Sequence, residues 1–405
     1  MDLDISGIWK TIEGLEKAGY TSWLVGGAVR DLLKGEQPRD IDLLTNAGED
    51  MIMSLFPRAR RIGKGDQVSW ILPMGEGNWE LTCLGVRSLE EELQRRDFTI
   101  NAMAMDSDGS VIDPFDGRKD LEEGILRFTG DPACRLREDP VRSLRFCRFA
   151  SIFHMLPEDA SCSVIRELSP GLPRAHKQRV GKEILLCAVK GGLSGFLSLA
   201  DDLELTGLYS FFPGIEKHGF TLVLKDLPPL EGLACLEELE RMGSFPVCAL
   251  ALFFLGEPGP FARNDVSDFI RGYAWPGNLV KGILQLRRYA LSLISSPSER
   301  MIFEMIEEVE YQVRRDVFAL VSAIFAEAGK DLRPLKQKAD LMYRMEKELL
   351  SSGLLLGGRE IMELFQLSPG RHVGSIRRKI RFLVATGRIS SREEVIREIQ
   401  AILDN

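Results

Sequence analysis

The chain has 405 residues, a formal net charge of −8, 44% hydrophobic residues and 28% charged residues. A chain of this length exceeds one ordinary hydrophobic core, so we expect a globular, water-soluble protein of roughly two to four domains. No apolar run is long enough to cross a membrane, the first residues lack the order of a signal peptide, and the acidic charge by itself argues weakly against a nucleic-acid partner.

The distribution of basic residues weakens the argument against a nucleic-acid partner. Arginines crowd residues 135–148, and a second basic tract covers residues 371–397. An acidic protein can still bind a polyanion through such tracts. The seven cysteines are scattered and never stand in Cys-x-x-Cys spacing, which indicates reduced thiols in a cytoplasmic protein and not a zinc site or a disulfide framework.

The N-terminal region predicts a strand, a glycine turn and a helix, in that order, after a first amphipathic helix. Residues 22–25 (SWLV) predict the strand, and Gly26 and Gly27 predict the turn. Residues 28–33, which include Arg30, predict the start of the helix. Unpaired N–H groups and the helix dipole point at such a turn, so it is a candidate anion site with a triphosphate as its natural ligand.

Two aspartates follow ten residues after Arg30. Asp40 and Asp42 flank one residue at the entrance of a second predicted strand, where residues two apart face the same side. Paired carboxylates hold hard divalent cations such as Mg²⁺, and beside a phosphate cradle they make the layout of a two-metal nucleotidyl-transfer site. Either feature alone is more often a plain turn or a solvated pair, but their order within one short stretch favours the catalytic interpretation.

The next predicted elements are a helix around residues 49–56 and two strands at residues 67–72 and 78–84. Glu80 has the opposite parity to Trp79 in the second of these strands. It is therefore either a third carboxylate that faces the same metals or a solvated strand residue, and both alternatives stay open.

A charged helix at residues 90–97 leads into the segment RRDFTINAMA. The apolar part of this segment should be buried against the sheet. Arg96 and Asp97 then lie at the rim of the nucleotide cleft, where they can contact phosphate or ribose hydroxyls, or they simply end a surface helix. A last short strand at residues 110–113 runs into the turn motif DPFDG.

Five motifs in this order, LVGGAVRD, DID, RRDFTINAMA, DPFDG and EDPVRSLRFCRFA, resemble those of the class II tRNA nucleotidyltransferases and bacterial poly(A) polymerases. Enzymes of this superfamily rebuild the CCA end of tRNA or add A tails. The similarity is strong over about the first 190 residues. Segments within residues 205–216, 269–284 and 357–374 more weakly resemble body and tail elements of the tRNA-specific members.

The resemblance implies an α+β N-terminal nucleotidyltransferase head, built on a small mixed sheet with helices, and all-α neck, body and tail domains after it. The expected boundaries are 1–137 for the catalytic head, 138–197 for the base-recognising neck, 198–335 for the body and 336–405 for the tRNA-binding tail. Within the head, Gly26, Gly27 and Arg30 are expected to hold the triphosphate. Arg96 and Asp97 are expected to read the sugar.

The neck segment resembles the part of the family that selects the base. Arg142, Arg145 and Arg148 fall on one side of a predicted helix. By position, Asp139 and Arg142 match the pair that acts as a template for the incoming base. A carboxylate acceptor beside a guanidinium donor fits cytosine and adenine, whereas uracil and guanine present the opposite order. Arg145 and Arg148 would serve the nucleotide or the primer end.

Two neighbouring features bear on this neck helix. Pro140 favours the first helical position, so Asp139 can instead be the N-cap of the helix. Downstream, Arg179 and Glu183 resemble the residues of an E-R-x-x-x-E segment that braces the base-reading helix. Gln178 stands where the family has the leading glutamate, so this sequence departs from the pattern there.

The C-terminal segment 375–388 carries an apolar stripe with basic residues off it. The basic side is either a solvated face or, following the family layout, a surface that neutralises tRNA backbone phosphates. The residues expected to do so are Arg377, Arg378, Lys379 and Arg381.

The absence of a loop after the strand of Glu80 indicates which nucleotides the enzyme adds. Family members that add all of CCA usually carry a flexible polar loop between the strand of Glu80 and the Arg-Arg-Asp motif, whereas here residues 82–85 pass almost directly into 86–90. In the family, this shortening is associated with enzymes that add two cytidines and stop.

The expected function is therefore CC addition to the tRNA 3′ end from CTP with Mg²⁺, and a partner enzyme would add the terminal A. Full CCA addition from CTP and ATP, and poly(A) synthesis, remain as alternatives. A non-catalytic RNA-binding protein is disfavoured because such a protein would be free to lose Asp40 and Asp42.

Overall fold

The computed structural model describes residues 5–38, 40–63, 68–74, 77–212, 221–222, 227, 230–241, 247–255, 263–295, 298–351, 353 and 355–404. The chain divides into two compact units. The first unit consists of Met1–Glu183 and Gly195–Leu208, and the second of Ile184–Ser194 and Tyr209–Asn405. Among the described residues, no helix has the length and apolar character needed to span a membrane.

The first unit contains a mixed sheet whose described strands run in the order β3-β4-β5-β2-β1-β6-β7. The strands are β1 (Ser22–Val25), β2 (Asp42–Thr45), β3 (Arg60–Ile62), β4 (Ser69–Met74), β5 (Gly77–Cys83), β6 (Ala104–Met105) and β7 (Val111–Ile112). Strand β2 pairs with β5 in parallel, and the other pairs are antiparallel. The strands predicted from residues 22–25 and 78–84 are confirmed. Of the predicted strand at 67–72, Gln67 lies outside the described residues.

The alternation of side chains along β1 and β2 gives the sheet two apolar faces. Leu24 and Leu43 belong to a core that also includes buried residues of the first three helices, whereas Val25 and Leu44 belong to a smaller core on the opposite side. The helices around the sheet are α1 (Ile5–Lys17), α2 (Gly27–Leu33), α3 (Glu49–Leu55) and α4 (Leu89–Gln94). Asp42 precedes Leu43 in β2, so it shares the face of Val25 and Leu44.

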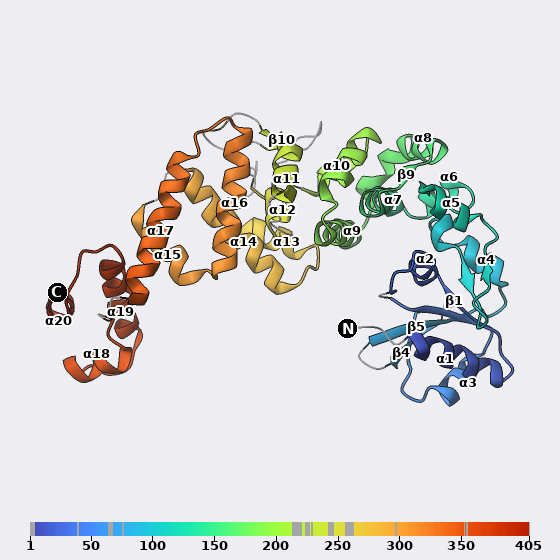
Figure 1. Cartoon of the computed structure of the whole chain (residues 1–405), viewed down its shortest axis with the longest axis horizontal. Helices are drawn as coiled ribbons and strands as arrows, with labels where there is room; N and C mark the ends of the chain where they lie inside the picture. The colour runs from blue at the N-terminus through green and yellow to red at the C-terminus, as the bar shows by residue number, and fades with distance from the viewer. Residues whose placement is uncertain are drawn as a thin grey trace. The chain divides into compact units, whose positions relative to one another are not determined.

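The remainder of the chain is mainly helical, as predicted (Figure 1). The 3₁₀ turns are η1 (Thr99–Asn101), η2 (Ser169–Arg174) and η3 (Thr206–Phe211). The helices are α5 (Gly117–Glu123), α6 (Pro132–Glu138), α7 (Val141–Phe153), α8 (Asp159–Leu168), α9 (Lys177–Lys190), α10 (Leu193–Asp202), α11 (Gly232–Arg241), α12 (Val247–Leu252), α13 (Arg263–Arg271), α14 (Gly277–Ile294), α15 (Glu299–Glu308), α16 (Tyr311–Glu327), α17 (Arg333–Ser351), α18 (Gly358–Phe365), α19 (Arg371–Ala385) and α20 (Arg392–Leu403).

Two short strand pairs interrupt the segments that were expected to be purely helical. Strand β8 (Ile125–Leu126) pairs with β9 (Leu156–Pro157), which lies in the predicted neck. Strand β10 (Thr221–Leu222) pairs with β11 (Leu230–Glu231), which lies in the predicted body. Two-residue strands carry too little pattern to be predicted from sequence, so the all-α description needs this small correction.

The DPFDG turn is fixed by a capping carboxylate and by a close backbone contact. Asp113 accepts hydrogen bonds from the backbone N–H groups of Gly117 (2.8 Å) and Arg118 (2.9 Å) at the start of α5. A β-carbon on Gly117 would lie 2.1 Å from the carbonyl oxygen of Thr99. The backbone of α5 therefore packs directly on η1, at a distance that only glycine permits.

We predict that Gly117→Ala destabilises the protein by about 1–3 kcal/mol, because backbone must move to admit the methyl group. The midpoint of denaturant unfolding measures this. Gly14→Ala is the matched control, because Gly14 lies inside α1 with no atom within 4 Å of its β-carbon position. That variant should gain about 0.5–1 kcal/mol of stability. A Gly117→Ala protein as stable as the wild type would contradict the prediction.

Candidate active site

The glycine turn at the end of β1 brings an arginine and a carboxylate close together. Gly26 has φ 75° and is the N-cap residue of α2. A β-carbon on Gly26 would lie 2.2 Å from Nη1 of Arg96 and 3.4 Å from Oδ2 of Asp42. The left-handed backbone and this close approach both require glycine. Gly27, the first residue of α2, has Arg30 as its near neighbour.

Strand pairing places three side chains in one row across the sheet. Val25 pairs with Asp42 in the antiparallel β1–β2 ladder, and Asp42 pairs with Glu80 in the parallel β2–β5 ladder. Glu80 therefore faces the same side of the sheet as Asp42, as its parity predicts. Strand β2 begins at Asp42, so Asp40 stands in the loop just before the strand, where it is exposed.

Asp42 has a raised pKa because it is buried close to other carboxylates. Burial raises the pKa of its carboxyl group, and the charges of Glu80 and Asp40 raise the pKa further. The Arg96 guanidinium, with Nη1 3.6 Å from Oδ2 of Asp42, acts in the opposite direction. A nearby cation would relieve the repulsion between these carboxylates.

The oxygen donors of this acidic site fit Mg²⁺. Mg²⁺ is usually held by one or two carboxylates, with waters and substrate phosphates completing its shell. Within the described ranges, no three or more His, Cys, Asp or Glu side chains are gathered closely enough to hold a metal by themselves. Asp40 and Asp42 would thus supply only part of the shell, with Glu80 as the adjacent third carboxylate, and their role as metal ligands stays a prediction.

Arg30 lies inside the unit. Its side chain is 9% exposed, and it donates hydrogen bonds to Oδ1 of Asp31 (3.0 and 2.6 Å) and to Oδ1 of Asn101 (2.7 Å). Its guanidinium carbon also lies 4.4 Å from the ring centroid of Phe153 on α7. The contacts of Arg30 therefore connect α2 with η1 and α7, and its role in triphosphate binding stays a prediction.

Asp97, like Arg30, is held by other residues of the first unit, whereas its neighbour Arg96 lies beside Asp42. Its Oδ1 accepts hydrogen bonds from the backbone N–H of Phe98 (2.9 Å) and from Nδ2 of Asn101 (3.0 Å). Its Oδ2 lies 2.5 Å from Nε of Arg145. Arg96 is thus beside the acidic site, whereas Asp97 is held between η1 and α7.

The start of α7 is held by a carboxylate that is itself clamped. Asp139 accepts a hydrogen bond from the backbone N–H of Val141 (3.2 Å), so it contributes to the cap of the helix. Arg179 of α9 directs Nη1 (2.9 Å) and Nη2 to the two carboxylate oxygens of Asp139. Asp139 thus bonds to the start of the helix, as the capping interpretation predicts, and its role in base reading stays a prediction.

The other neck arginines also have carboxylate partners. Nη1 of Arg142 lies 2.6 Å from Glu138 and also donates to the backbone carbonyl of residue 135 (2.9 Å). Nε of Arg148 lies 2.5 Å from Oε2 of Glu183, whose side chain is buried. Arg179 and Glu183, one turn apart on α9, thus each contact the segment that was predicted to select the base.

Three of the four basic residues predicted to bind tRNA, Arg378, Lys379 and Arg381, are paired within the second unit. Arg378 binds Glu308 (2.5 Å) and Arg381 binds Glu307 (2.7 Å), both on α15. Lys379 lies 3.1 Å from Glu398 on α20. Among the described residues, Arg377 is exposed and has no ion pair.

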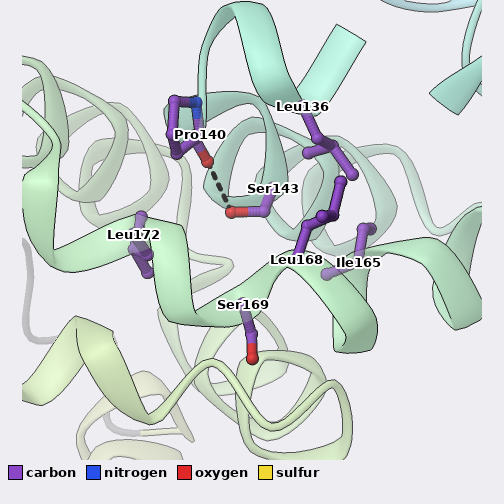
Figure 2. Close-up of a pocket in the computed structure, with 7 residues that line it drawn as sticks. All are labelled: Leu136, Pro140, Ser143, Ile165, Leu168, Ser169 and Leu172. Atoms are coloured by element: carbon purple, nitrogen blue, oxygen red, sulfur yellow. Dashed lines mark hydrogen bonds between the residues drawn. The ribbon is translucent and has the colours of Figure 1, made fainter. Parts of the chain in front are cut away.

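The hollow drawn in Figure 2 is not a nucleotide site. It lies beneath the start of α7, where Oγ of Ser143 donates to the carbonyl of Pro140 (2.7 Å), and has a volume of about 10 Å³. That space holds one water molecule at most. Its lining consists of Leu136, Pro140, Ser143, Ile165, Leu168, Ser169 and Leu172.

The connection from β5 to α4 is tightly closed. The strand ends at Cys83, the helix begins at Leu89, and the N–H of Arg87 donates to the carbonyl of Leu84 (3.2 Å) in the turn between them. Ser88 and Glu91 form a capping box at the start of α4. This segment therefore has no room for a long flexible loop.

Sequence reasoning missed the residues that connect the elements of the site. Asn101, Asp31 and Glu138 bind the predicted arginines, and Phe149 and Phe153 lie under them. Asn101 offered one signal, because it is an amide inside the otherwise apolar part of RRDFTINAMA.

Comparisons with known proteins agree with this geometry. Residues 22–82 and 78–127 match the family described as Poly A polymerase head domain. The chain is 34% identical to the CC-adding tRNA nucleotidyltransferase of Halalkalibacterium halodurans, over 89% of this chain and 87% of that protein. It is 27% identical to the CCA-adding enzyme of Enterococcus faecalis, over 95% of this chain and 93% of that protein.

Solved structures share the fold along the whole chain. The Bacillus stearothermophilus CCA-adding enzyme in complex with CTP has a TM-score of 0.67, with 23% identity and full coverage of both chains. The Thermotoga maritima CCA-adding enzyme complexed with tRNA has a TM-score of 0.67, with 20% identity and coverage of 100% of this chain and 96% of the other. Given the identity to the Halalkalibacterium halodurans protein over most of both chains, this chain belongs to the tRNA nucleotidyltransferase family of enzymes, which includes CCA-adding and CC-adding members.

Proposed function

We propose that the protein adds two cytidines to the 3′ end of tRNA, taking CMP from CTP, and that a separate enzyme adds the terminal adenosine. The observation that carries this proposal is the closed connection between β5 and α4, where CCA-adding members are expected to carry a flexible loop. The 34% identity to a protein named as CC-adding supports the same product. With tRNA as substrate, the proposed place of action is the cytoplasm.

The alternative is full CCA addition from CTP and ATP. It is supported by the relatives named as CCA-adding enzymes, whose similarity covers more than nine tenths of this chain, such as that of Enterococcus faecalis at 95%. Poly(A) synthesis is less well supported, because that family name attaches only to residues 22–127.

The proposed reaction is an in-line attack of the tRNA 3′-hydroxyl on the α-phosphate of CTP, which releases pyrophosphate. Asp40 and Asp42, with Glu80 beside them, would hold two Mg²⁺ ions, which polarise the phosphate and activate the attacking hydroxyl when bound. Gly26 and Gly27 leave room for the phosphates at the end of β1. Because the RNA hydroxyl is the nucleophile, the protein needs no nucleophile of its own.

The neck residues would select cytosine. Arg179 fixes the direction of the Asp139 carboxylate, and Arg142 lies one turn into α7. The Asp139 carboxylate would accept from the amino group of cytosine, and the Arg142 guanidinium would donate to its ring nitrogen. Arg145 and Arg148 would then serve the nucleotide or the primer end, and Arg377, Arg378, Lys379 and Arg381 would contact the tRNA backbone.

We expect products that stop at two added nucleotides when tRNA ending at the discriminator base is incubated with Mg²⁺, CTP and ATP. Single-nucleotide sizing of the products, with CTP alone and ATP alone as parallel reactions, checks this. Three added nucleotides would establish the CCA alternative. Long ladders with ATP alone would instead place the protein with the poly(A) polymerases.

Removal of the paired carboxylates, Asp40→Ala with Asp42→Ala, should lower CMP incorporation by about a thousand-fold or more, because the cation site is lost. Binding of tRNA in a gel-shift assay should be retained. Asp50→Ala, which removes an exposed carboxylate of α3, is the control and should incorporate CMP like the wild type. Unchanged incorporation by the double variant would overturn the metal assignment.

Gly26→Ala should lose most CMP incorporation, because its methyl group displaces Arg96 from the side of Asp42. Gly35→Ala is a matched control: Gly35 has φ 74°, almost equal to the 75° of Gly26, but no atom within 4 Å of its β-carbon position. Both variants place alanine at a positive φ, so both unfolding midpoints should fall, and that of Gly26→Ala should fall further because its methyl group also meets Arg96. Equal activity of the two variants would show that the Arg96 contact does not matter.

A further inference from the structure

We propose that Asn101 is a positioning residue, which orients Asp97 and through it Arg145 on α7 relative to Arg30 on α2. The proposal rests on the proposed function, because its main readout is CMP addition to tRNA. It assigns to a buried amide the task of connecting the glycine turn with the neck helix.

The hydrogen bonds of Asn101 define its orientation uniquely. The residue is only 5% exposed. Its Oδ1 accepts from Nη1 of Arg30 (2.7 Å), and its Nδ2 donates to Oδ1 of Asp97 (3.0 Å). An ionised arginine can only donate and an ionised carboxylate can only accept, so the amide cannot be reversed without losing both bonds.

The chain of contacts continues at both ends. Beyond Arg30, Nε and Nη2 donate to Oδ1 of Asp31, which fixes the guanidinium from its other side. Beyond Asp97, Oδ2 lies 2.5 Å from Nε of Arg145. Hydrogen bonds therefore run from α2 through η1 to Asp97, and an ion pair continues the contacts from Asp97 to α7. We call these five residues, Asp31, Arg30, Asn101, Asp97 and Arg145, the relay.

The aromatic rings of α7 connect the two arginines a second time. The guanidinium carbon of Arg30 lies 4.4 Å from the ring centroid of Phe153 and 5.6 Å from that of Phe149. Arg145 lies 5.7 Å from the same Phe149 ring. A displacement of Arg30 or Asp97 therefore changes the contacts of side chains on α7. One of these side chains, Arg145, lies one turn away from Arg142.

Through this arrangement Asn101 affects the reaction by positioning other residues, without contact to the substrate. Arg142 and Arg145 stand three residues apart on α7, so they share one face of that helix. If Arg145 loses its anchor on Asp97, the base-reading face of α7 loses its connection to the triphosphate turn. A small misplacement between reacting groups of this kind lowers catalysis much more than it lowers substrate binding.

The test compares Asn101→Leu, which removes both hydrogen bonds at similar volume, with Asn101→Asp, which keeps the acceptor for Arg30 but repels Asp97. Both variants should lower kcat for CMP addition by about a hundred-fold, leave KM for tRNA unchanged, and raise UMP misincorporation relative to CMP. The rise in UMP misincorporation is the deciding readout, because a general loss of folded protein lowers the apparent kcat but leaves KM and the preference for CTP over UTP unchanged.

Thr99→Val is the matched control from the same 3₁₀ turn. It removes the hydrogen bond from Oγ1 of Thr99 to Oδ2 of Asp120 (2.6 Å) and leaves the relay intact. It should lose stability but keep the wild-type kcat and the wild-type preference for CTP over UTP.

If both Asn101 variants fail to fold, Arg145→Met decides, because that side chain is 44% exposed and can be shortened without opening the core. It should reproduce the kcat loss and the UMP misincorporation. Wild-type kcat and selectivity in the folded Asn101 variants, or in Arg145→Met, would overturn the relay. A wild-type protein that adds no CMP to tRNA would instead overturn the proposed function.

Discussion

The crowding of negative charge at the start of β2 is the constraint on which the site depends. Sheet register places Glu80 beside Asp42, and burial with these neighbouring charges raises the Asp42 pKa. Arg96 opposes this effect across the gap that Gly26 leaves open. A nearby cation would relieve this repulsion, which is consistent with the proposed role of Asp42 as a metal ligand.

The rest of the first unit keeps this acidic site in place with respect to the neck. Arg30 reaches from α2 to a residue 71 positions later in the chain, and Arg179 and Glu183 of α9 hold Asp139 and Arg148. Each of these bonds joins groups of opposite charge or a charge and an amide, which are the stronger hydrogen bonds of a partly buried site. The first unit thus combines an apolar sheet core with an ionic framework.

Local patterns predicted most of the described sheet strands and helices, because alternation and helical spacing depend on neighbouring residues. The short strands β3 (Arg60–Ile62) and β6 (Ala104–Met105) were missed. The partners of the arginines could not be predicted in this way. Arg30, Arg142 and Arg378 all looked free for an anionic ligand, yet each binds a carboxylate or an amide. One of these partners lies one helical turn away and the others some seventy residues away, so most of the pairing is decided by tertiary packing, which no local pattern records.

The pairing of the tail arginines affects how the binding of a polyanion to the tail surface depends on salt concentration. A phosphate that takes the place of Glu308 on Arg378, or of Glu307 on Arg381, exchanges one ion pair for another. The displaced glutamate then takes up a counterion from solution, which offsets the counterions that the nucleic acid releases. The affinity of such a surface depends less steeply on ionic strength than its number of arginines suggests.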